Sequence, residues 1–549
     1  MIRPTCAVLA LSVLACDAAE APCPEGTRPS GGECIEPIEI RTSGVGFRPE
    51  RKKRASYTGE GTAFSVKRVD DGEVVFEGRA SDEIDAPDSG ERVRVLDFSE
   101  VTAPGEYYLS VAGEGKSAEF AIGDDVFLES FHAVMAGLYG LRCGTEVRFE
   151  WRGQEFRHGE CHLSDDPGFG GWHDAGDYGK YTNNGAFSLA MVLFAWEHFG
   201  ERIEGIALDI PERGGDLPDF LDEAKYQVDW LLAMQNEEGG VADRLTPPNF
   251  DPLQTMPEGT GTARNLAPVS TVGTADFIAV IARAARVFEP YDADYAARCR
   301  DAAVKAWDFV EAQDAVLPPA QAGFTGSYQS SPQDDLMWAA AELWETTGEE
   351  AYLTRFEEVS KGFVVRTNFD WPELQNLGFF TYLNSKREGR DSTRVEEIET
   401  AVINAGTQMA ESAEEHAYGR SMREIYYWGI NGVVARTAMG LYQTYLLTNE
   451  ERYLDALSFQ LDHLLGRNFY GRSFLTGVGF DPPQSPHHRP SIADGVNPPW
   501  PGLLVGGPSQ GGDPEPATRW VDNFNDYESN EVAINWNAAM IYAVAAMLP

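Results

Sequence analysis

The feature that most constrains the fold is a long series of helical segments that runs from about Phe127 to the C-terminus. Apolar residues recur three and four positions apart in segments such as FLESFHAVMAGLYGL, TADFIAVIARAARVF and NEVAINWNAAMIYAVAAM. This spacing places the apolar side chains on one face of an α-helix. Roughly eleven or twelve such helices follow one another, too many for a simple bundle. The sequence therefore predicts a large helical domain over residues 127–549.

A different pattern precedes the helices, between residues 38 and 123. Short runs of alternating apolar and polar residues, such as FSVKRV, RVRVLDF and EYYLSVA, are separated by glycine, proline and aspartate turns. Alternation with turns about every ten residues is typical of a small antiparallel β-sandwich. We expect residues 38–123 to form such a sandwich and to support the helical domain.

The first residues of the chain indicate export. Arg3 precedes an apolar run over residues 7–15, far shorter than the roughly 20 residues of a membrane-spanning helix. Two processing routes remain open: a cut after Ala21, or a lipoprotein-type cut before Cys16, which would then carry lipid. Residues 1–21 are thus expected to be a signal or lipoprotein segment, with no transmembrane segment. The protein is expected to be secreted or lipid-anchored at the bacterial cell surface.

The cysteines after the signal fall into two groups. Cys23 and Cys34 lie in a linker of residues 22–37, where a small disulfide loop is the default outside the cytoplasm. Cys299 lies within a helical pattern and is expected to be a buried thiol. Cys143 and Cys161 lie in the helical domain near several histidines.

The acidic net charge of the chain limits the classes of molecule that it is expected to bind. The chain of 549 residues has 87 acidic and 44 basic residues, which gives a formal net charge of −43. Nucleic acids and anionic membranes require basic surfaces, so neither is an expected partner. An uncharged sugar polymer is compatible with this charge.

One loop combines two carboxylates with glycines and aromatic residues. The run GGWHDAGDYGKY covers residues 170–181 and places Asp174 and Asp177 three residues apart. Two carboxylates at this spacing can converge on one water molecule, and aromatic neighbours suit the apolar faces of sugar rings. A solvated turn or a calcium loop is the alternative interpretation.

Two further segments carry groups suited to chemistry. Asp522 and Glu531 lie in a run that leads into the last helical segment. Contact with the core would desolvate Glu531, raise the pKa of its carboxyl and keep it protonated, as a general acid requires. Alternatively, Glu531 is a first-turn residue that the helix dipole favours. His487 and Arg489 lie in a proline-rich loop and could donate hydrogen bonds, although a lone histidine is usually structural.

Together the three segments resemble glycoside hydrolase family 9, a family of mostly cellulases, from Phe127 to the C-terminus. The run from Trp520 to Ala538 fits the acid signature of the family throughout. The run from Leu465 to Arg489 follows the histidine signature except at Asp481. The resemblance implies an all-α (α/α)6 barrel preceded by a small all-β immunoglobulin-like sandwich.

The resemblance also implies roles for individual residues. Glu531 would be the general acid, Asp177 the general base, and Asp174 a second carboxylate that holds the nucleophilic water. Asp522 would orient nearby donors. Sugar contacts would come from His487, Arg489, Trp338, Trp428 and Trp536, the last at a position where many relatives carry tyrosine.

A zinc site is expected on four residues of the first loop region. Cys143, Cys161, His162 and His173 could form a closed tetrahedral set, with His158 as a substitute ligand. The alternative is a Cys143–Cys161 disulfide, but the module-bearing subgroup of the family carries zinc on a comparable set. Calcium is common in the family, and its site cannot be located from the sequence.

The leading functional hypothesis is an inverting endo-β-1,4-glucanase that acts on cellulose or related neutral β-glucans as a monomer. An exo-acting β-glucosidase or glucosaminidase of the same fold is the nearest alternative. A zinc-dependent deacetylase is disfavoured because the metal set has no vacant position. A non-catalytic carbohydrate-binding surface protein is disfavoured because Asp177 and Glu531 are both present.

Overall fold

The chain divides into two units, Met1–Pro37 and Ile38–Pro549. The computed structural model describes residues 28–30, 33–35, 39–165, 167–509 and 514–549. In the first unit, strands β1 (Arg28–Ser30) and β2 (Glu33–Ile35) pair antiparallel. The predicted signal segment, with Cys16, lies outside the described residues, as does Cys23 of the predicted disulfide loop.

A β-sandwich opens the second unit. One sheet has the strand order β4-β12-β10-β6-β7, with β11 added to β10, and the other has the order β3-β5-β9-β8. The strands are β3 (Ile40–Arg41), β4 (Gly46–Phe47), β5 (Arg54–Tyr57), β6 (Ala63–Arg68), β7 (Val74–Arg79), β8 (Ile84–Ala86), β9 (Glu91–Asp97), β10 (Gly105–Val111), β11 (Gly115–Lys116) and β12 (Phe120–Ile122).

Aromatic residues fill the space between the two sheets. Phe47 contacts Phe98 and Phe120 edge-on, with ring centroids 5.3 Å apart in both pairs. Edge-to-face packing adds about 0.5–1.5 kcal/mol to the burial of each such pair. The sandwich therefore has its own apolar core.

The remaining residues form two concentric sets of helices. Adjacent inner helices pack together everywhere except between α8 and α10, and each outer helix packs against an inner one. The inner set is α2 (Thr182–Ile203), α4 (Thr271–Phe288), α6 (Pro332–Thr347), α8 (Gln375–Asn384), α10 (Ile430–Thr448) and α14 (Ile534–Ala545). The outer set is α1 (Leu128–Tyr139), α3 (Asp219–Ala233), α5 (Ala293–Glu311), α7 (Glu350–Ser360), α9 (Ser392–Glu415) and α11 (Arg452–Leu464).

Burial follows the hydrophobic pattern of each set. Every residue of α14 is buried, whereas α9 buries one stripe and exposes the rest to solvent. Between α8 and α10, Asn384 and Gln443 close the ring by exchanging side-chain amide hydrogen bonds of 2.9 and 2.8 Å. The predicted (α/α)6 barrel with a preceding β-sandwich is confirmed.

Loops and small elements cover the end of the barrel where the chain enters the inner helices. The segments ahead of α2 and α14 meet through an antiparallel bridge between Ala175 and Ala533. The small elements are β13 (Val147–Trp151), β14 (Gln154–His158), β15 (Lys180–Tyr181), β16 (Arg244–Thr246), β17 (Asn265–Leu266), η1 (Pro257–Gly259), η2 (Pro516–Thr518), α12 (Arg489–Ala493) and α13 (Tyr527–Asn530).

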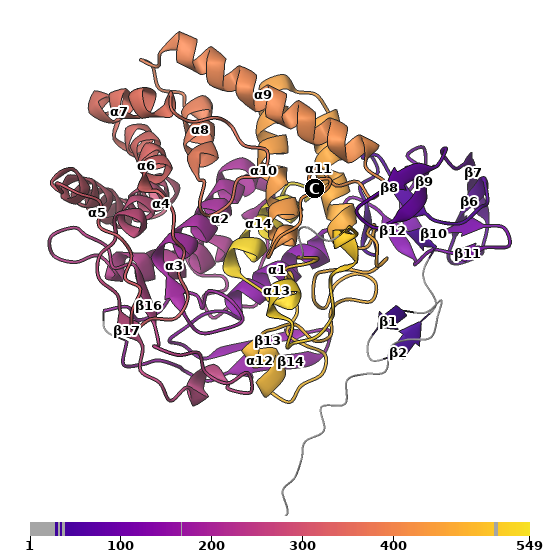
Figure 1. Cartoon of the computed structure of the whole chain (residues 1–549), viewed down its shortest axis with the longest axis horizontal. Coiled ribbons are helices and arrows are strands. Elements are labelled where there is room, and N and C mark those ends of the chain that lie inside the picture. The colour runs from indigo at the N-terminus through magenta and orange to yellow at the C-terminus, as the bar shows by residue number, and fades with distance from the viewer. Residues whose placement is uncertain (1–27, 31–32, 36–38, 166, 510–513) are drawn as a thin grey trace, which may run out of the picture. The chain divides into compact units, whose positions relative to one another are not determined.

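The sandwich packs beside α11 and the C-terminal end of α9 (Figure 1). Asp88, in the loop between β8 and β9, accepts hydrogen bonds from Tyr426 (2.5 Å) and His416 (3.3 Å) and lies 3.9 Å from Arg420. Burial favours the neutral form of this carboxyl, but these partners outweigh it and lower the pKa of Asp88 to about 2. The interface therefore contains a buried anion held by the barrel.

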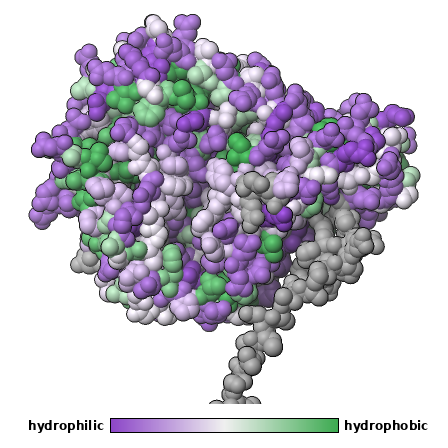
Figure 2. Space-filling model, viewed as in Figure 1, coloured by the Kyte–Doolittle hydropathy of each residue, from purple (hydrophilic) through white to green (hydrophobic). Residues whose placement is uncertain are grey.

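On the face drawn in Figure 2, hydrophilic residues dominate and hydrophobic residues form separate patches. Within the described ranges, no helix is both long enough and apolar enough to cross a membrane.

We predict that Asp88→Asn lowers the free energy of unfolding by about 2 kcal/mol at pH 7. A carboxyl whose pKa is depressed in the folded state stabilises the protein above its unfolded pKa and loses that contribution as the pH falls. The variant should therefore lose less stability than the wild type between about pH 5 and pH 2. Thermal unfolding across this range measures both effects. Asp85→Asn, at an exposed position of β8, is the control; an equal effect there would contradict the prediction.

Candidate active site and metal centre

Asp174 and Asp177 lie in a closed turn ahead of α2. The Asp174 N–H donates to the Gly179 carbonyl (2.9 Å), and the Gly179 N–H donates to Asp177 Oδ1 (2.7 Å). A Cβ atom at Gly176 would come within 2.0 Å of the His487 carbonyl oxygen, so only glycine fits there. These contacts fix both carboxylates in what we call the base turn, residues 174–179.

Asp174 is buried and its two oxygens are used by the protein. Asn184 Nδ2 donates to Oδ1 (2.7 Å), and the Tyr328 hydroxyl donates to Oδ2 (2.6 Å). Burial raises the pKa of Asp174 to about 7, although both hydrogen bonds oppose the shift. Both carboxyl oxygens of Asp174 therefore have protein partners, which fix the position of this side chain.

Asp177 is half-buried and more open than Asp174. Burial raises the pKa of Asp177, while the Gly179 N–H and the charges of Arg489 and His487 oppose the shift by favouring the carboxylate. Of the two carboxyls in the turn, Asp177 is thus the one suited to accept a proton from a bound water.

Glu531 faces the base turn from the other side. The Ile534 N–H donates to the Asp174 carbonyl (2.8 Å), and the Glu531 carbonyl accepts from the Gly506 N–H (2.9 Å). Burial, then the charges of Asp177 and Asp174, raise the pKa of Glu531 well above its ordinary value. Among the described contacts, no hydrogen bond joins Glu531 to Asp177.

Glu531 does not lie in the first turn of a helix. Its backbone is extended, with φ −68° and ψ 162°, between α13 and α14. The interpretation in which the helix dipole holds Glu531 is therefore wrong. A parallel bridge to His487 fixes this segment instead.

Arg489 contacts the base turn through its guanidinium. Its guanidinium donates to the Gly176 carbonyl (2.7 Å) and to the Asp251 carbonyl (3.1 and 2.8 Å), and the residue is only 5 % exposed. The expectation that it also binds sugar hydroxyls stays a prediction, since three of its five N–H donors serve backbone carbonyls. It braces the base turn.

Asp522 and His487 organise the loop beside Glu531. Asp522 accepts from the backbone N–H groups of Gln484 (2.8 Å) and Ser485 (2.9 Å) and pairs with Arg472 (3.2 Å). His487 Nδ1 donates to the Phe524 carbonyl (2.6 Å). Burial lowers the pKa of His487, and in the neutral ring this contact leaves Nε2 as an acceptor.

The three predicted aromatic contacts differ in exposure. Trp428 is 49 % exposed and stands against Tyr527, with ring centroids 5.3 Å apart. Trp338 is fully buried and donates its indole N–H to Glu342 (2.9 Å), so it cannot stack on a sugar and that prediction is wrong. Trp536 is 7 % exposed and packs against Gly429, which leaves little ring surface for stacking.

Sequence reasoning missed the two partners of Asp174. Tyr328 lies in the loop ahead of α6, and Asn184 lies in the first turn of α2. The length of the Tyr328 loop was the available signal, since long loops in compact domains are usually functional.

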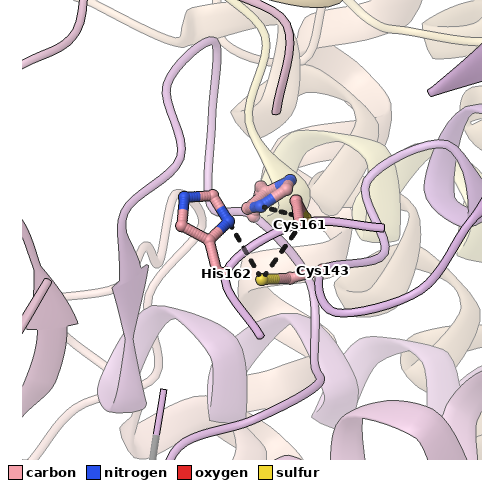
Figure 3. A group of neighbouring side chains, drawn as sticks. Cys143, Cys161 and His162 are labelled. Atoms are coloured by element: carbon pink, nitrogen blue, oxygen red, sulfur yellow. Dashed lines mark hydrogen bonds between the residues drawn. The ribbon is translucent and has the colours of Figure 1, made fainter. Parts of the chain in front are cut away.

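Four predicted metal ligands converge beside the base turn. Cys143, Cys161, His162 and His173 each offer one atom, and these atoms lie within 4.8 Å of one another. The Sγ atoms of the two cysteines are 3.9 Å apart, so they form no disulfide. Cys143 Sγ lies 3.6 Å from His162 Nδ1 (Figure 3). Cys161 Sγ lies 3.9 Å from His173 Nε2.

These distances fit a tetrahedral metal ion. With metal–sulfur bonds of about 2.3 Å and metal–nitrogen bonds of about 2.0–2.1 Å, the tetrahedral edges are about 3.8 Å between sulfurs and about 3.6 Å between sulfur and nitrogen. His162 adopts a left-handed backbone with φ 53°, which costs energy for a residue other than glycine. The donor set and the geometry both suit a closed metal site.

The substitute ligand His158 stays outside this set. Its Nδ1 lies 2.8 Å from the Gly159 carbonyl, and its ring stacks on Trp500 with centroids 6.0 Å apart. The Cys143 set is the one group of three or more His, Cys, Asp or Glu ligands that converges within the described residues. The expected calcium therefore remains a prediction without a site.

Comparison with known proteins adds an independent line of observation. The family model for glycosyl hydrolase family 9 matches residues 127–544, and the model for a cellulase N-terminal immunoglobulin-like domain matches residues 36–116. Endoglucanase D of Acetivibrio thermocellus is 41% identical over 527 residues, which cover 93% of this chain and 83% of that protein.

Two other relatives align with this chain over nearly their full length. A xyloglucan-specific endo-β-1,4-glucanase of Bacteroides ovatus is 32% identical, with 93% of each chain covered. The crystal structure of a Zn-binding triple mutant of the family 9 endoglucanase J30 has a TM-score of 0.84 at 31% identity. That alignment covers 91% of this chain and 99% of the mutant.

Proposed function

Because the chain belongs to glycosyl hydrolase family 9, we propose that it is an endo-β-1,4-glucanase that hydrolyses cellulose or related neutral β-glucans with inversion. The observation that carries this proposal is the pairing of the base turn with the Glu531 segment. Backbone hydrogen bonds hold the two segments together, and the charge of Asp177 acts on Glu531 although no hydrogen bond among the described residues joins their side chains.

Inversion needs two carboxyl groups in opposite protonation states, about 6.5–9.5 Å apart, with room for water and the glycosidic bond between them. Asp177 acts as the general base, because it is the more open of the two carboxyls in the turn and the charge of Arg489 opposes the rise of its pKa. Its carboxylate takes a proton from the water that attacks the anomeric carbon. Asp174, held by Tyr328 and Asn184, orients the base turn and contributes negative charge near that water.

Glu531 acts as the general acid. Burial and the two nearby aspartates keep its carboxyl protonated near neutral pH, so it can donate a proton to the oxygen of the leaving sugar. A hydrogen bond from the Trp428 side chain opposes this shift and ties the acid to an exposed aromatic ring. Trp428 would stack on the sugar nearest the acid.

The relatives favour endo action over exo action. The enzymes that are 41% and 32% identical over most of their lengths are both named as endo-acting glucanases. Viscosity and reducing ends should be followed together on soluble cellulose, lichenan, xylan, xyloglucan and chitosan. Endo action predicts that viscosity falls before small sugars accumulate, whereas release of small sugars at nearly constant viscosity would contradict it.

We also propose that the metal centre holds zinc in a structural role. Two thiolates and two imidazoles suit zinc, and four protein ligands leave no position for substrate or water. His173 directly precedes Asp174, so the metal would stabilise the start of the base turn. The closed set also argues against a zinc-dependent deacetylase.

Export and oligomeric state belong to the same proposal. A signal segment at residues 1–21 would place the enzyme outside the cytoplasm, either free or anchored through Cys16. We propose that it acts there as a monomer on an uncharged polymer.

We predict that Asp177→Asn and Glu531→Gln each lower kcat at least about 100-fold without unfolding the protein. Each change keeps the shape of the side chain and removes the proton transfer. Initial rates on soluble cellulose and thermal unfolding measure the two effects. Glu528→Gln, at an exposed position of α13, is the matched control and should retain wild-type turnover. Wild-type turnover in Asp177→Asn would refute its assignment as the base.

The pH dependence of kcat/KM should be bell-shaped. Activity falls on the acid side as Asp177 gains a proton and on the alkaline side as Glu531 loses one. Trp428→Phe removes the hydrogen bond that lowers the pKa of Glu531, so the alkaline limb should move to higher pH. Trp196→Phe, on the outward part of α2, should leave the profile unchanged. A shift of the alkaline limb to lower pH in Trp428→Phe would contradict the assignment.

We predict about one zinc ion per chain and a loss of thermal stability of about 5 °C or more when a chelator removes it. Cys161→Ser should reduce the zinc content and abolish the response to the chelator. Cys299→Ser changes a buried free thiol elsewhere in the barrel and should retain zinc. Metal analysis with thiol titration distinguishes the outcomes, since two oxidised thiols without zinc would mean a disulfide.

A further inference from the structure

One segment outside the predicted site touches both the metal ligands and the base turn. We call residues 255–266 the strap; it includes η1 and β17. The Thr255 carbonyl accepts from the Tyr178 hydroxyl (2.5 Å), and Thr260 Oγ1 lies 3.0 Å from His162 Nε2. The strap thus contacts a metal ligand at one point and the base turn at another.

The side chain of Arg264, in the strap, contacts both the base turn and a metal ligand. Its Nη1 donates to the Tyr178 carbonyl (2.5 Å), and its Nη2 donates to Cys143 Sγ (3.0 Å). Nη2 also pairs with the Asp165 carboxylate, and the Arg264 side chain is only 1 % exposed. A buried guanidinium with its donors so placed has a fixed position.

The base turn is therefore held by two guanidinium groups. Arg489 binds the Gly176 carbonyl (2.7 Å), and Arg264 binds the Tyr178 carbonyl (2.5 Å). These two carbonyls flank Asp177 on either side in the sequence. Of the two arginines, Arg264 is the one that also touches a metal ligand.

The chemistry of the contacts requires arginine. A planar guanidinium presents several N–H donors in a rigid fork, whereas the single ammonium of lysine is a compact point charge. Lysine at this position could reach the carbonyl or the sulfur but could not reproduce the fork. N–H donors to a metal-bound thiolate also orient the ligand, and loss of such outer contacts typically costs 10- to 100-fold in metal affinity.

We propose that Arg264 is a positioning residue that couples the metal centre to the general base. Its guanidinium fixes the Cys143 thiolate and the Tyr178 carbonyl relative to each other, so that metal binding at one end orders Asp177 at the other. This inference rests on the proposed function and extends it to a residue that does not touch the substrate.

Arg264→Lys tests the coupling. Competition for zinc with a chromogenic chelator, without substrate, should show about 10- to 100-fold weaker zinc binding. At saturating zinc, kcat should fall about 10-fold or more with KM nearly unchanged, because the base is misplaced and the sugar contacts are not. Removing zinc should lower kcat by a smaller factor in this variant than in the wild type, because the link between the two sites is already broken.

Thr260→Val is the matched control within the strap. It removes a contact to His162 and leaves the contact of Arg264 with the base turn in place, so zinc binding should weaken while kcat at saturating zinc falls by a smaller factor than in Arg264→Lys. Wild-type zinc affinity in Arg264→Lys, or an unchanged effect of zinc removal on its kcat, would overturn the proposal.

A second variant keeps the test valid if Arg264→Lys does not fold. Asp165→Asn removes the charge that holds Arg264 without changing a metal ligand or the base turn, and it should weaken zinc binding and lower kcat by smaller factors. No effect on either quantity would overturn the proposal. A wild-type protein without zinc would overturn the coupling and the metal assignment together, and would leave the Asp177 and Glu531 assignments to be judged by their own variants.

Discussion

The site depends on backbone pairing between two segments that lie far apart in the sequence. The Ile534 N–H donates to the Asp174 carbonyl, and Ala175 pairs with Ala533. These contacts set the distance between a carboxylate turn ahead of α2 and an extended segment ahead of α14. Side chains then only refine positions that the main chain has already fixed. The closed ring of inner helices makes this possible, because it brings the entries of its first and last members side by side.

Burial supplies the chemical difference between the two sides of the site. Glu531 is shielded from water and lies near two other acids, which favours its neutral form. Asp177 is also desolvated and its pKa is raised, but the Gly179 N–H and the charge of Arg489 oppose that shift. The same kind of side chain is thus shifted to different extents by its surroundings, and such a difference is how one fold can provide an acid and a base at the same pH.

The sequence was most informative where a local pattern determines the structure. Helical periodicity predicted a large helical domain, which the family resemblance made a barrel, and the spacing of Asp174 and Asp177 among glycines predicted a turn with two carboxylates. The Cys143 set was also predicted, from two cysteines and two histidines close in sequence together with the family resemblance, which favoured zinc over a disulfide. Each of these signals lies within a short stretch of chain or in a rare combination of residue types.

The failures share a physical cause, which is that exposure and partner choice depend on tertiary packing. Trp338 lies on an inner helix whose surroundings bury it, and nothing in its own segment reveals that. The contacts of Arg489 with the base turn were also not foreseen, because the carbonyls that accept from it belong to segments more than 200 residues away. Tyr328 and Arg264 were missed for the same reason, since their partners come from distant parts of the chain.

The long sequence separation between base and acid has a consequence for biogenesis. The base turn emerges from the ribosome about 350 residues before Glu531 does, and the ring of inner helices cannot close until α14 follows. Until α14 has folded onto its neighbours, the two segments that carry Asp177 and Glu531 belong to an unfinished barrel. The pair of catalytic carboxyls is therefore complete only once α14 has been made and the ring of inner helices has closed.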